Sequence, residues 1–313
     1  MKVLVAGATG AIGKQLVPKL VANGHAVVGM TRSEAKADEV RRLGAEPAIA
    51  DALDPEQVAA AVAASEPEAI VHELTALSGD LDLRNLDRTF ALTNRLRTEG
   101  TDHLLSAARA AGVERFLAQS FAGWPYARSG GPVKDEQAPL DNDPPASARE
   151  MLAAIRHLER AVTEATWTEG IVLRYGGFYG PGTSLAPGSE QFEAIRKRRY
   201  PVVGGGEGVT SFVHVEDAAE ATVLALERAR PGIYNIVDDD PAPVREWLPE
   251  VARQVGAKPP LRVPRWLGRL LAGEAATVMM TEVRGASNEK AKRELGWAPG
   301  RSSWRQGLAE LTR

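Results

Sequence analysis

One short segment constrains this chain more than any other: GATGAIG, at residues 7–13. It follows a continuous apolar run, Val3–Ala6, and leads into apolar positions that recur at helical spacing. A glycine-rich turn between a strand and a helix lets the backbone approach a diphosphate, which free N–H groups and the helix dipole then bind. The segment predicts a dinucleotide-binding turn, with a purely structural turn as the alternative. The expected contacts are Gly7, Thr9, Gly10, Ala11, Ile12 and Gly13.

Short apolar runs alternate with helical patterns along the first half of the chain. This alternation predicts an α/β fold with a Rossmann-type, doubly wound parallel sheet. A long helix is expected over about residues 87–111, a bend at Pro18 and a helix start capped by Asp54. The later runs Phe212–Val215 and Tyr234–Ile236 are expected to return to the sheet. Strands are expected at Val3–Ala6, Ala26–Met30, Ala48–Ala50, Ala69–Leu74, Arg115–Gln119 and Ile171–Arg174.

The remaining segments are glycine-rich or helical with proline breaks. We therefore expect two domains. Residues 1–175 plus 211–238 would form the NADP-binding Rossmann domain. Residues 176–210 plus 239–313 would form a smaller, mostly helical, substrate-binding domain.

The end of the second strand indicates which dinucleotide binds. NAD-binding versions of this turn usually carry an acidic residue there, for the ribose hydroxyls. Here the strand leads into Thr31-Arg32-Ser33, with no acid. The Arg32 guanidinium is placed to pair with a 2′-phosphate and Ser33 to donate a hydrogen bond to it, so NADP(H) is favoured over NAD(H). The alternative is an ordinary surface arginine at a helix start.

An aspartate after the third strand is the candidate adenine contact. The Asp51 carboxylate can accept from the adenine amino group while the Ala52 N–H donates to the ring. A loop or helix-capping aspartate is the alternative. Further cofactor contacts are expected from Leu74, Thr75 and Gln119 at strand ends.

Composition narrows the functional classes. A net charge of −3 gives no electrostatic reason for nucleic-acid or membrane binding, and the absence of cysteine excludes disulfides and thiolate chemistry. No metal site is expected. The sequence shows no signal-peptide pattern and no membrane-spanning run. We expect a cytoplasmic protein that binds a small-molecule substrate, with a homodimer as an open alternative.

Beyond the glycine turn, the chain resembles the extended short-chain dehydrogenase/reductase family, in its NAD-dependent epimerase/dehydratase branch. The resemblance covers nearly the whole chain, and it implies a substrate cleft between the two domains. It also suggests that Tyr175 contacts the cofactor, with packing in the core as the alternative. The motifs are Asp51-Ala-Leu-Asp54, Ala69-Ile-Val-His-Glu73, Gly100-Thr101, Arg115-Phe-Leu-Ala-Gln-Ser120, Leu173-Arg-Tyr-Gly-Gly-Phe-Tyr-Gly-Pro-Gly182, Ser211-Phe-Val-His-Val-Glu-Asp-Ala-Ala219 and Lys290-Ala-Lys-Arg-Glu-Leu-Gly-Trp297.

The same resemblance exposes a departure at the reaction centre. The family uses a Ser or Thr after the fifth strand and a Tyr-x-x-x-Lys pair on the next helix, usually followed by a glutamate four residues later. Glu159 fits that glutamate, which puts Met151 at the tyrosine position and Ile155 at the lysine position. Neither side chain can manage a proton. Ser120 stands at the family's serine position, with Phe121 as the alternative, and Tyr126 in the following loop is the candidate for the missing acid.

Three functions remain open from the sequence. The first is an atypical NADP(H)-dependent oxidoreductase that acts on a small carbonyl or related substrate outside the sugar nucleotides. The second is a non-catalytic NADP(H)-binding sensor or regulatory protein, motivated by the degenerate reaction centre. The third is a sugar-nucleotide epimerase or dehydratase, which the missing tyrosine disfavours.

Overall fold

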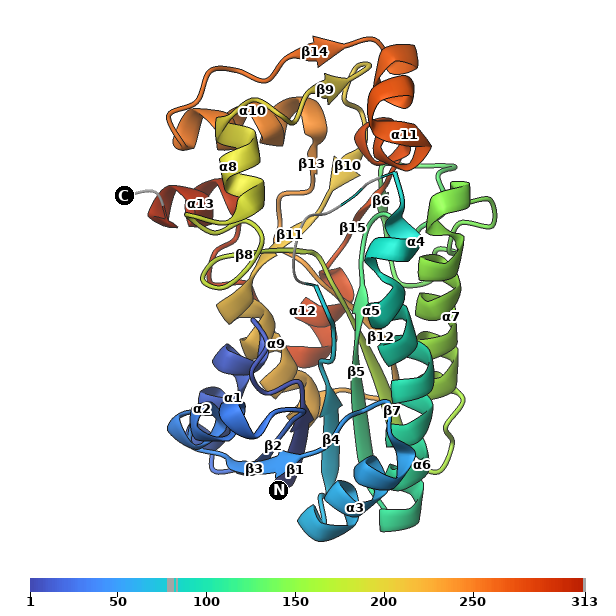
Figure 1. Ribbon diagram of the computed structural model, residues 1–313, viewed down its shortest axis with the longest axis vertical. Coiled ribbons are helices and arrows are strands. Elements are labelled where there is room, and N and C mark those ends of the chain that lie inside the picture. The colour runs from blue at the N-terminus through green and yellow to red at the C-terminus, as the bar shows by residue number, and fades with distance from the viewer. Residues whose placement is uncertain (78–81, 83, 312–313) are drawn as a thin grey trace.

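In the computed structural model, which describes residues 1–77, 82 and 84–311, one sheet of seven parallel strands forms the centre of the molecule (Figure 1). The strand order is β12-β7-β5-β4-β1-β2-β3, so the chain winds outward in both directions from β1. This order confirms the predicted Rossmann-type sheet. The strands are β1 (Lys2–Ala6), β2 (Ala26–Thr31), β3 (Glu46–Ile49), β4 (Ala69–His72), β5 (Arg115–Phe121), β7 (Glu169–Tyr175) and β12 (Gly232–Ile236).

Helices cover both faces of this sheet, and each face has its own apolar core. Because neither face meets water, the central strands read as unbroken apolar runs, as in β4, where every residue is buried. One face carries α1 (Gly13–Ala22), α2 (Ala37–Arg42), α9 (Val215–Arg228) and α12 (Glu289–Leu295). The other carries α3 (Pro55–Ser65), α6 (Thr101–Ala111) and α7 (Arg149–Thr163).

Local signals placed several helix ends correctly. Asp54 caps α3 through one carboxylate oxygen, which accepts the N–H groups of Glu56 and Gln57. Pro18 lies inside α1, and the helix continues through it. The long helix expected over residues 87–111 is interrupted: it consists of α4 (Leu86–Thr89), α5 (Ala91–Arg95), the π-helical turn η2 (Leu96–Gly100) and α6.

One predicted strand lies outside the main sheet. Phe212–His214 forms β11, which pairs in parallel with β8 (Gly177–Tyr179) in a separate two-stranded sheet, so the prediction that it returns to the main sheet is wrong. The reason is a close approach just beyond β7: a Cβ on Gly176 would lie 2.8 Å from the carbonyl oxygen of Ser211. Tyr234–Ile236 does return, as the edge strand β12.

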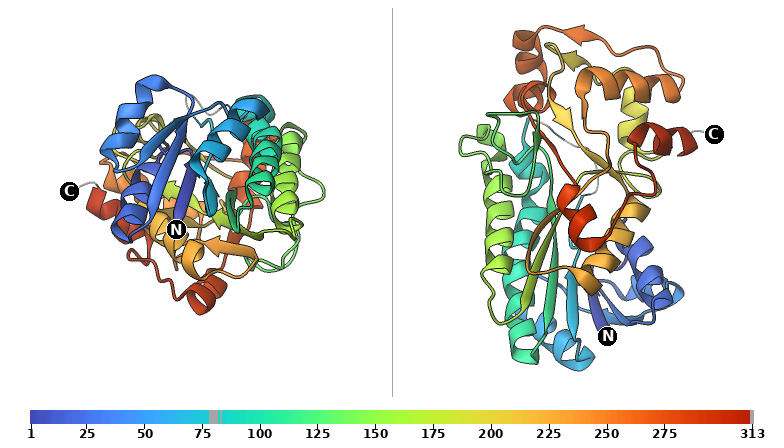
Figure 2. Two further views of the ribbon diagram at one scale, coloured as in Figure 1. Left: turned by 90° about the horizontal axis from the view of Figure 1, so that it is seen from below. Right: turned by 180° about the vertical axis from the view of Figure 1, so that it is seen from behind.

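Short strands and helices gather beyond the carboxyl edge of the main sheet (Figures 1 and 2). They share a third apolar cluster, which includes Tyr179, Phe212, Trp247 and Trp304. The division into two domains at the expected boundaries stays a prediction. The remaining elements are η1 (Glu34–Lys36), β6 (Val133–Lys134), η3 (Ala146–Ala148), α8 (Glu190–Arg196), β9 (Val202–Val203), β10 (Val209–Thr210), β13 (Ala242–Pro243), α10 (Val244–Gln254), β14 (Arg262–Val263), α11 (Arg265–Thr281), β15 (Gly285–Ala286) and α13 (Trp304–Leu311).

Among the residues that the structure describes, no helix combines the length and apolarity needed to cross a bilayer.

A buried carboxyl group follows β4. Glu73 is 3% exposed, and its Oε1 accepts a hydrogen bond from the Tyr175 hydroxyl at 3.0 Å. That hydroxyl also lies 2.7 Å from Oγ1 of Thr222 on α9. Burial raises the pKa of Glu73 from 4.5 to about 8, so the side chain is protonated at neutral pH. The carboxyl group therefore links β4, β7 and α9 as a neutral acid.

The replacement Glu73→Gln tests this protonation. A raised pKa contributes stability that is complete below the unfolded pKa of 4.5 and is lost as pH rises toward about 8. Glutamine does not titrate, so the stability of the variant relative to the parent should increase with pH. We expect an increase on the order of 1 kcal/mol per pH unit, measured by urea unfolding between about pH 5 and about pH 8.

Two features make this comparison specific. Asp238 also has a pKa raised to about 8 by burial, but it is present in both proteins and cancels in the difference. The exposed Glu56 on α3 provides the control, and Glu56→Gln should show no such slope. A pH-independent difference for Glu73→Gln would show that Glu73 is ionised in the folded protein.

Candidate functional site

The glycine turn between β1 and α1 is packed so closely that it excludes side chains. Gly7 adopts φ +100°, and a Cβ there would lie 2.8 Å from the carbonyl oxygen of Glu73. A Cβ on Gly13 would lie 2.3 Å from the carbonyl oxygen of Gly7. The Gly10 N–H donates to the same oxygen at 2.9 Å and closes the turn. The turn therefore requires glycine at residues 7 and 13.

The amino end of α1 has the properties of an anion site. Within the described part of the chain, its N-cap Ile12 makes no side-chain capping bond and its first turn holds no acidic residue. Gly10 is exposed and Thr9 and Ala11 are half-buried, so a ligand can approach the backbone here. Uncapped N–H groups and the helix dipole favour negative charge at this position. The turn fits the diphosphate of a dinucleotide.

Arg32 lies directly beyond the last residue of β2. Its side chain is exposed, and it forms no ion pair with any described residue. Ser33 is half-buried and extended, at φ −121° and ψ 124°, immediately before η1. An unpaired guanidinium at this strand end is free to meet an anion, and its contact with a 2′-phosphate stays a prediction.

Asp51 follows β3, where the adenine contact is expected. Its Oδ1 accepts the Leu53 N–H at 3.0 Å, and its own N–H donates to Oε1 of Gln57. Since Asp54 caps α3, the helix-capping alternative for Asp51 is wrong. Ala52 is buried at 1% exposure. The contacts of Asp51 and Ala52 with the adenine ring stay a prediction.

Three further predicted contacts lie at the ends of β4 and β5. Leu74, Thr75 and Gln119 are all half-buried. The Leu74 N–H donates to Nδ1 of His72 at 3.2 Å. Because these strands flank β1 on one side, their carboxyl ends lie beside the glycine turn. Their role as cofactor contacts stays a prediction.

Tyr175 lies in the core. It has no exposed surface, and its hydroxyl is held by Glu73 and Thr222. Its place on the cofactor side stays a prediction. Tyr175 supports the segment after β4 from within the core.

The family's reaction centre is apolar in this chain. Met151 and Ile155 are both 1% exposed on α7. Met151 packs with Leu86, Ala148 and Ala275, and Phe90, Trp124 and Met279 border that cluster. We call these seven residues the Met151 cluster. At its edge, the ring centroids of Phe121 and Trp124 lie 6.4 Å apart.

The two candidate catalytic residues are buried. Ser120 and Tyr126 are each 1% exposed. The Ser120 hydroxyl donates to Glu159 at 2.7 Å, and the Tyr126 hydroxyl donates to Oδ1 of Asn235 at 2.5 Å. Burial raises the pKa of Tyr126, which disfavours its ionisation. Both hydroxyls belong to an interior network, and a catalytic role for either residue stays a prediction.

An ion pair organises that network. Arg174 donates to both carboxylate oxygens of Glu159, at 2.7 and 2.6 Å, and to the Tyr126 hydroxyl at 3.2 Å. Two parallel bonds fix both side chains and compensate for their burial. Glu159 therefore joins α7 to β7 and has no free oxygen for a substrate.

Sequence analysis missed two buried polar residues opposite α7. Asn94 and Arg97 are 8% and 5% exposed, on α5 and η2. The signal was present: residues 94, 97, 101, 104 and 108 share one helical face, and a buried face of this kind is normally apolar throughout.

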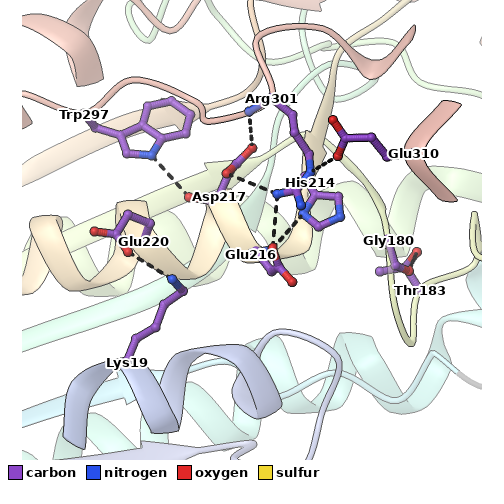
Figure 3. Close-up of polar contacts among 10 residues, drawn as sticks. All are labelled: Lys19, Gly180, Thr183, His214, Glu216, Asp217, Glu220, Trp297, Arg301 and Glu310. Atoms are coloured by element: carbon purple, nitrogen blue, oxygen red, sulfur yellow. Dashed lines mark hydrogen bonds and ion pairs between the residues drawn. The ribbon is translucent and has the colours of Figure 1, made fainter. Parts of the chain in front are cut away.

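Residues of the C-terminal segment bind the amino end of α9 (Figure 3). His214 caps the helix, with its Nδ1 accepting the Glu216 N–H at 3.3 Å, and burial lowers its pKa. Arg301 pairs with Glu216 at 3.1 Å and its N–H donates to Asp217 at 2.9 Å. Trp297 donates to the Asp217 carbonyl. His214 thus has a structural part in the fold.

Comparisons with known proteins agree with this geometry. The family model for the "NAD dependent epimerase/dehydratase family" matches residues 3–237. A 3-diazoavenalumate denitrifying reductase from a Streptomyces species is 46% identical over 98% of this chain and 99% of its own. A 4-hydroxy-2-methyl-3-oxo-4-farnesyl-3,4-dihydroquinoline-1-oxide ketoreductase from Stigmatella aurantiaca is 29% identical over 99% of this chain and 96% of its own.

Solved structures have the same fold. The UDP-glucose 4-epimerase of Thermus thermophilus in complex with NAD is 25% identical, with a TM-score of 0.75 over 100% of this chain and 98% of its own. The similarity to reductases and to an NAD complex supports an oxidoreductase that uses a nicotinamide dinucleotide. The chain belongs to the NAD-dependent epimerase/dehydratase family, of the extended short-chain dehydrogenase/reductase type.

Proposed function

We propose that this protein is an NADPH-dependent reductase that replaces the diazo group of an aromatic acid with hydrogen. The observation that carries the proposal is the apolar reaction centre, where Met151 and Ile155 stand in place of the tyrosine and lysine. The 46% identity with a reductase named for a diazo substrate supports the substrate class.

The chemistry explains why a proton donor is dispensable. When bound, the reduced dinucleotide supplies a hydride. The aromatic carbon gains a C–H bond from the hydride pair, its C–N bond breaks, and the electrons of that bond leave with N₂. Atoms and charge balance without a proton, because an aryl diazonium cation plus a hydride gives a neutral arene and N₂. Reduction of a carbonyl leaves an alkoxide that must be protonated, for which a positioned acid is normally used.

The Met151 cluster suits a flat, poorly hydrated substrate. Its aromatic members, Phe90 and Trp124, offer ring faces, and the methionines adapt to irregular shapes. Excluding water from this place also protects a diazonium group from hydrolysis. The half-buried members, Phe90, Trp124 and Met279, would contact and shield the substrate above the buried part of the cluster, with no part in proton transfer.

A carboxylate borders this cluster. Asp87 on α4 is half-buried, and its Oδ1 accepts the Met151 N–H at 2.9 Å. A carboxylate beside an apolar cluster favours a cationic diazonium group over a neutral ligand. Asp87 would therefore orient the charged end of the substrate.

Preference for NADPH over NADH rests on Arg32. The residues that follow β2 include an unpaired guanidinium and no carboxylate at the expected ribose position. The second candidate, reduction of a small carbonyl, is favoured by the 29% identity with a ketoreductase. The missing acid makes it the weaker candidate.

An isotope experiment separates the two. The purified protein is incubated without oxygen with NADPH and with 3-diazoavenalumate or diazotised aminobenzoic and aminocinnamic acids. We expect N₂ release by mass spectrometry and NADPH consumption in equal amounts. Deuterium carried on the nicotinamide should appear on the aromatic carbon, and deuterated water should leave the ring unlabelled.

The control is Gly13→Ala, whose added Cβ collides with the Gly7 carbonyl and should abolish both N₂ release and NADPH consumption. Hydrogen derived from water, or turnover of ketones without N₂ release, would exclude the diazo reaction and favour carbonyl reduction.

The cofactor preference has its own test. Arg32→Ala should weaken NADPH binding about tenfold to a hundredfold, because a charge-assisted contact to the 2′-phosphate is lost, and should change NADH binding by less than about twofold. Calorimetry measures both affinities. Arg41→Ala, which removes an exposed arginine paired with Asp38 on α2, should change neither. An equal loss for both dinucleotides would refute a phosphate contact.

A further inference from the structure

The interrupted helical segment from α5 to α6 presents polar side chains toward the interior. Asn94, Arg97 and Thr101 are spaced by three and four residues and are all buried. The turn that carries Arg97 is π-helical, a distortion that is frequent at functional sites. Polar residues in this position require partners.

Only some of these polar side chains have hydrogen-bond partners. The Thr101 hydroxyl lies 3.0 Å from Nε2 of His72. By contrast, Nδ2 and Oδ1 of Asn94 and Nη1 of Arg97 are buried without a hydrogen-bond partner among the described residues. Unmatched buried polar groups destabilise a fold, and a buried guanidinium does so more than a neutral group. Burial lowers the pKa of Arg97 only to about 10, so it remains a cation.

The surroundings leave this cation without a counter-ion. Glu159 is near enough to favour the charge on Arg97, but both of its oxygens are held by Arg174, and one also by Ser120. His72 is neutral at pH 7, since burial lowers its pKa to about 4. Arg97 thus has an attractive neighbour but no direct ion pair within the described residues.

Arg97 lies in an element that packs against α7, the helix that lacks the family's lysine. Both α5 and η2 pack against α7, the helix on which Ile155 replaces the family's lysine. On its other side, α5 is joined to the segment after β4, where Oγ1 of Thr93 accepts the Ala76 N–H at 3.0 Å. Arg97 therefore lies between the carboxyl edge of the sheet and the site of the missing cation.

We propose that Arg97, with Asn94 beside it, binds the ribose on the nicotinamide side of the dinucleotide, so that the cation absent from residue 155 is supplied from the opposite helix. Guanidinium and amide N–H groups donate to ribose hydroxyls, and the Asn94 carbonyl accepts from one. The proposal rests on the dinucleotide site proposed above. Unlike a lysine beside a tyrosine, this arginine has no proton donor to tune.

Three ligands of decreasing length locate the contact. NADPH has both ribose groups and the nicotinamide. The 2′-phosphorylated ADP-ribose lacks only the nicotinamide, and 2′-phosphorylated ADP lacks the second ribose as well but keeps the diphosphate. By calorimetry, Arg97→Met should weaken the first two about tenfold or more and change the third by less than about twofold.

Stability supplies a second readout. Arg97→Met replaces an unpaired buried charge with an apolar side chain of similar length, so the ligand-free variant should have a higher Tm than the parent. A residue with a purely structural role would lower it. Arg97→Lys should retain part of the affinity for NADPH, and Arg109→Met, at an exposed arginine on α6, should affect neither affinity nor Tm.

The outcomes are distinguishable. Equal weakening of all three ligands, or of none, would overturn the ribose contact, and weakening of NADPH alone would move the contact to the nicotinamide and overturn it too. If Arg97→Met does not fold, the same comparison is made with Arg97→Lys and Asn94→Ala. If the parent protein binds none of the ligands, the proposed cofactor site itself fails.

Discussion

The backbone contact between the glycine turn and the segment after β4 is the constraint on which the rest of this structure depends. Gly7 meets the carbonyl of Glu73, and Gly13 meets the carbonyl of Gly7, at distances that no side chain permits. The side chain of Glu73 then continues the contact inward to Tyr175 and Thr222. This series of contacts thus fixes the amino end of α1 relative to β4, β7 and α9.

At the position of the family's reaction centre, the remaining polar residue has a structural role. Glu159 matches the glutamate of the family pattern, but here its carboxylate binds the buried side chains of Arg174 and Ser120. The two positions that would handle a proton are apolar. Chemistry that transfers a hydride and releases a neutral leaving group is compatible with such a site, because no charge remains on the substrate that an acid must quench. The same apolar surroundings strengthen the electrostatic effect of a nearby carboxylate such as Asp87.

Features set by local sequence could be predicted, whereas features set by distant contacts could not. The glycine turn, the Asp54 cap and the central strands depend on neighbouring residues or on burial of both sheet faces, so pattern and spacing indicate them. The pairing of β11 with β8 depends on the approach of Gly176 to Ser211, across more than thirty residues. Chain position puts Tyr126 near the cleft and the family resemblance puts Tyr175 on the cofactor side, but neither indicates their hydroxyl partners, which come from elements remote in sequence.

The contacts between the C-terminal segment and α9 have a consequence for how the end of the chain is positioned. β11 leads directly into α9, and Trp297 and Arg301 return to the same first turn of that helix (Figure 3). Arg301 binds both the Glu216 carboxylate and, through its backbone N–H, the Asp217 carboxylate. The residues that lead into α13 are therefore positioned by the first turn of a helix that packs against the main sheet.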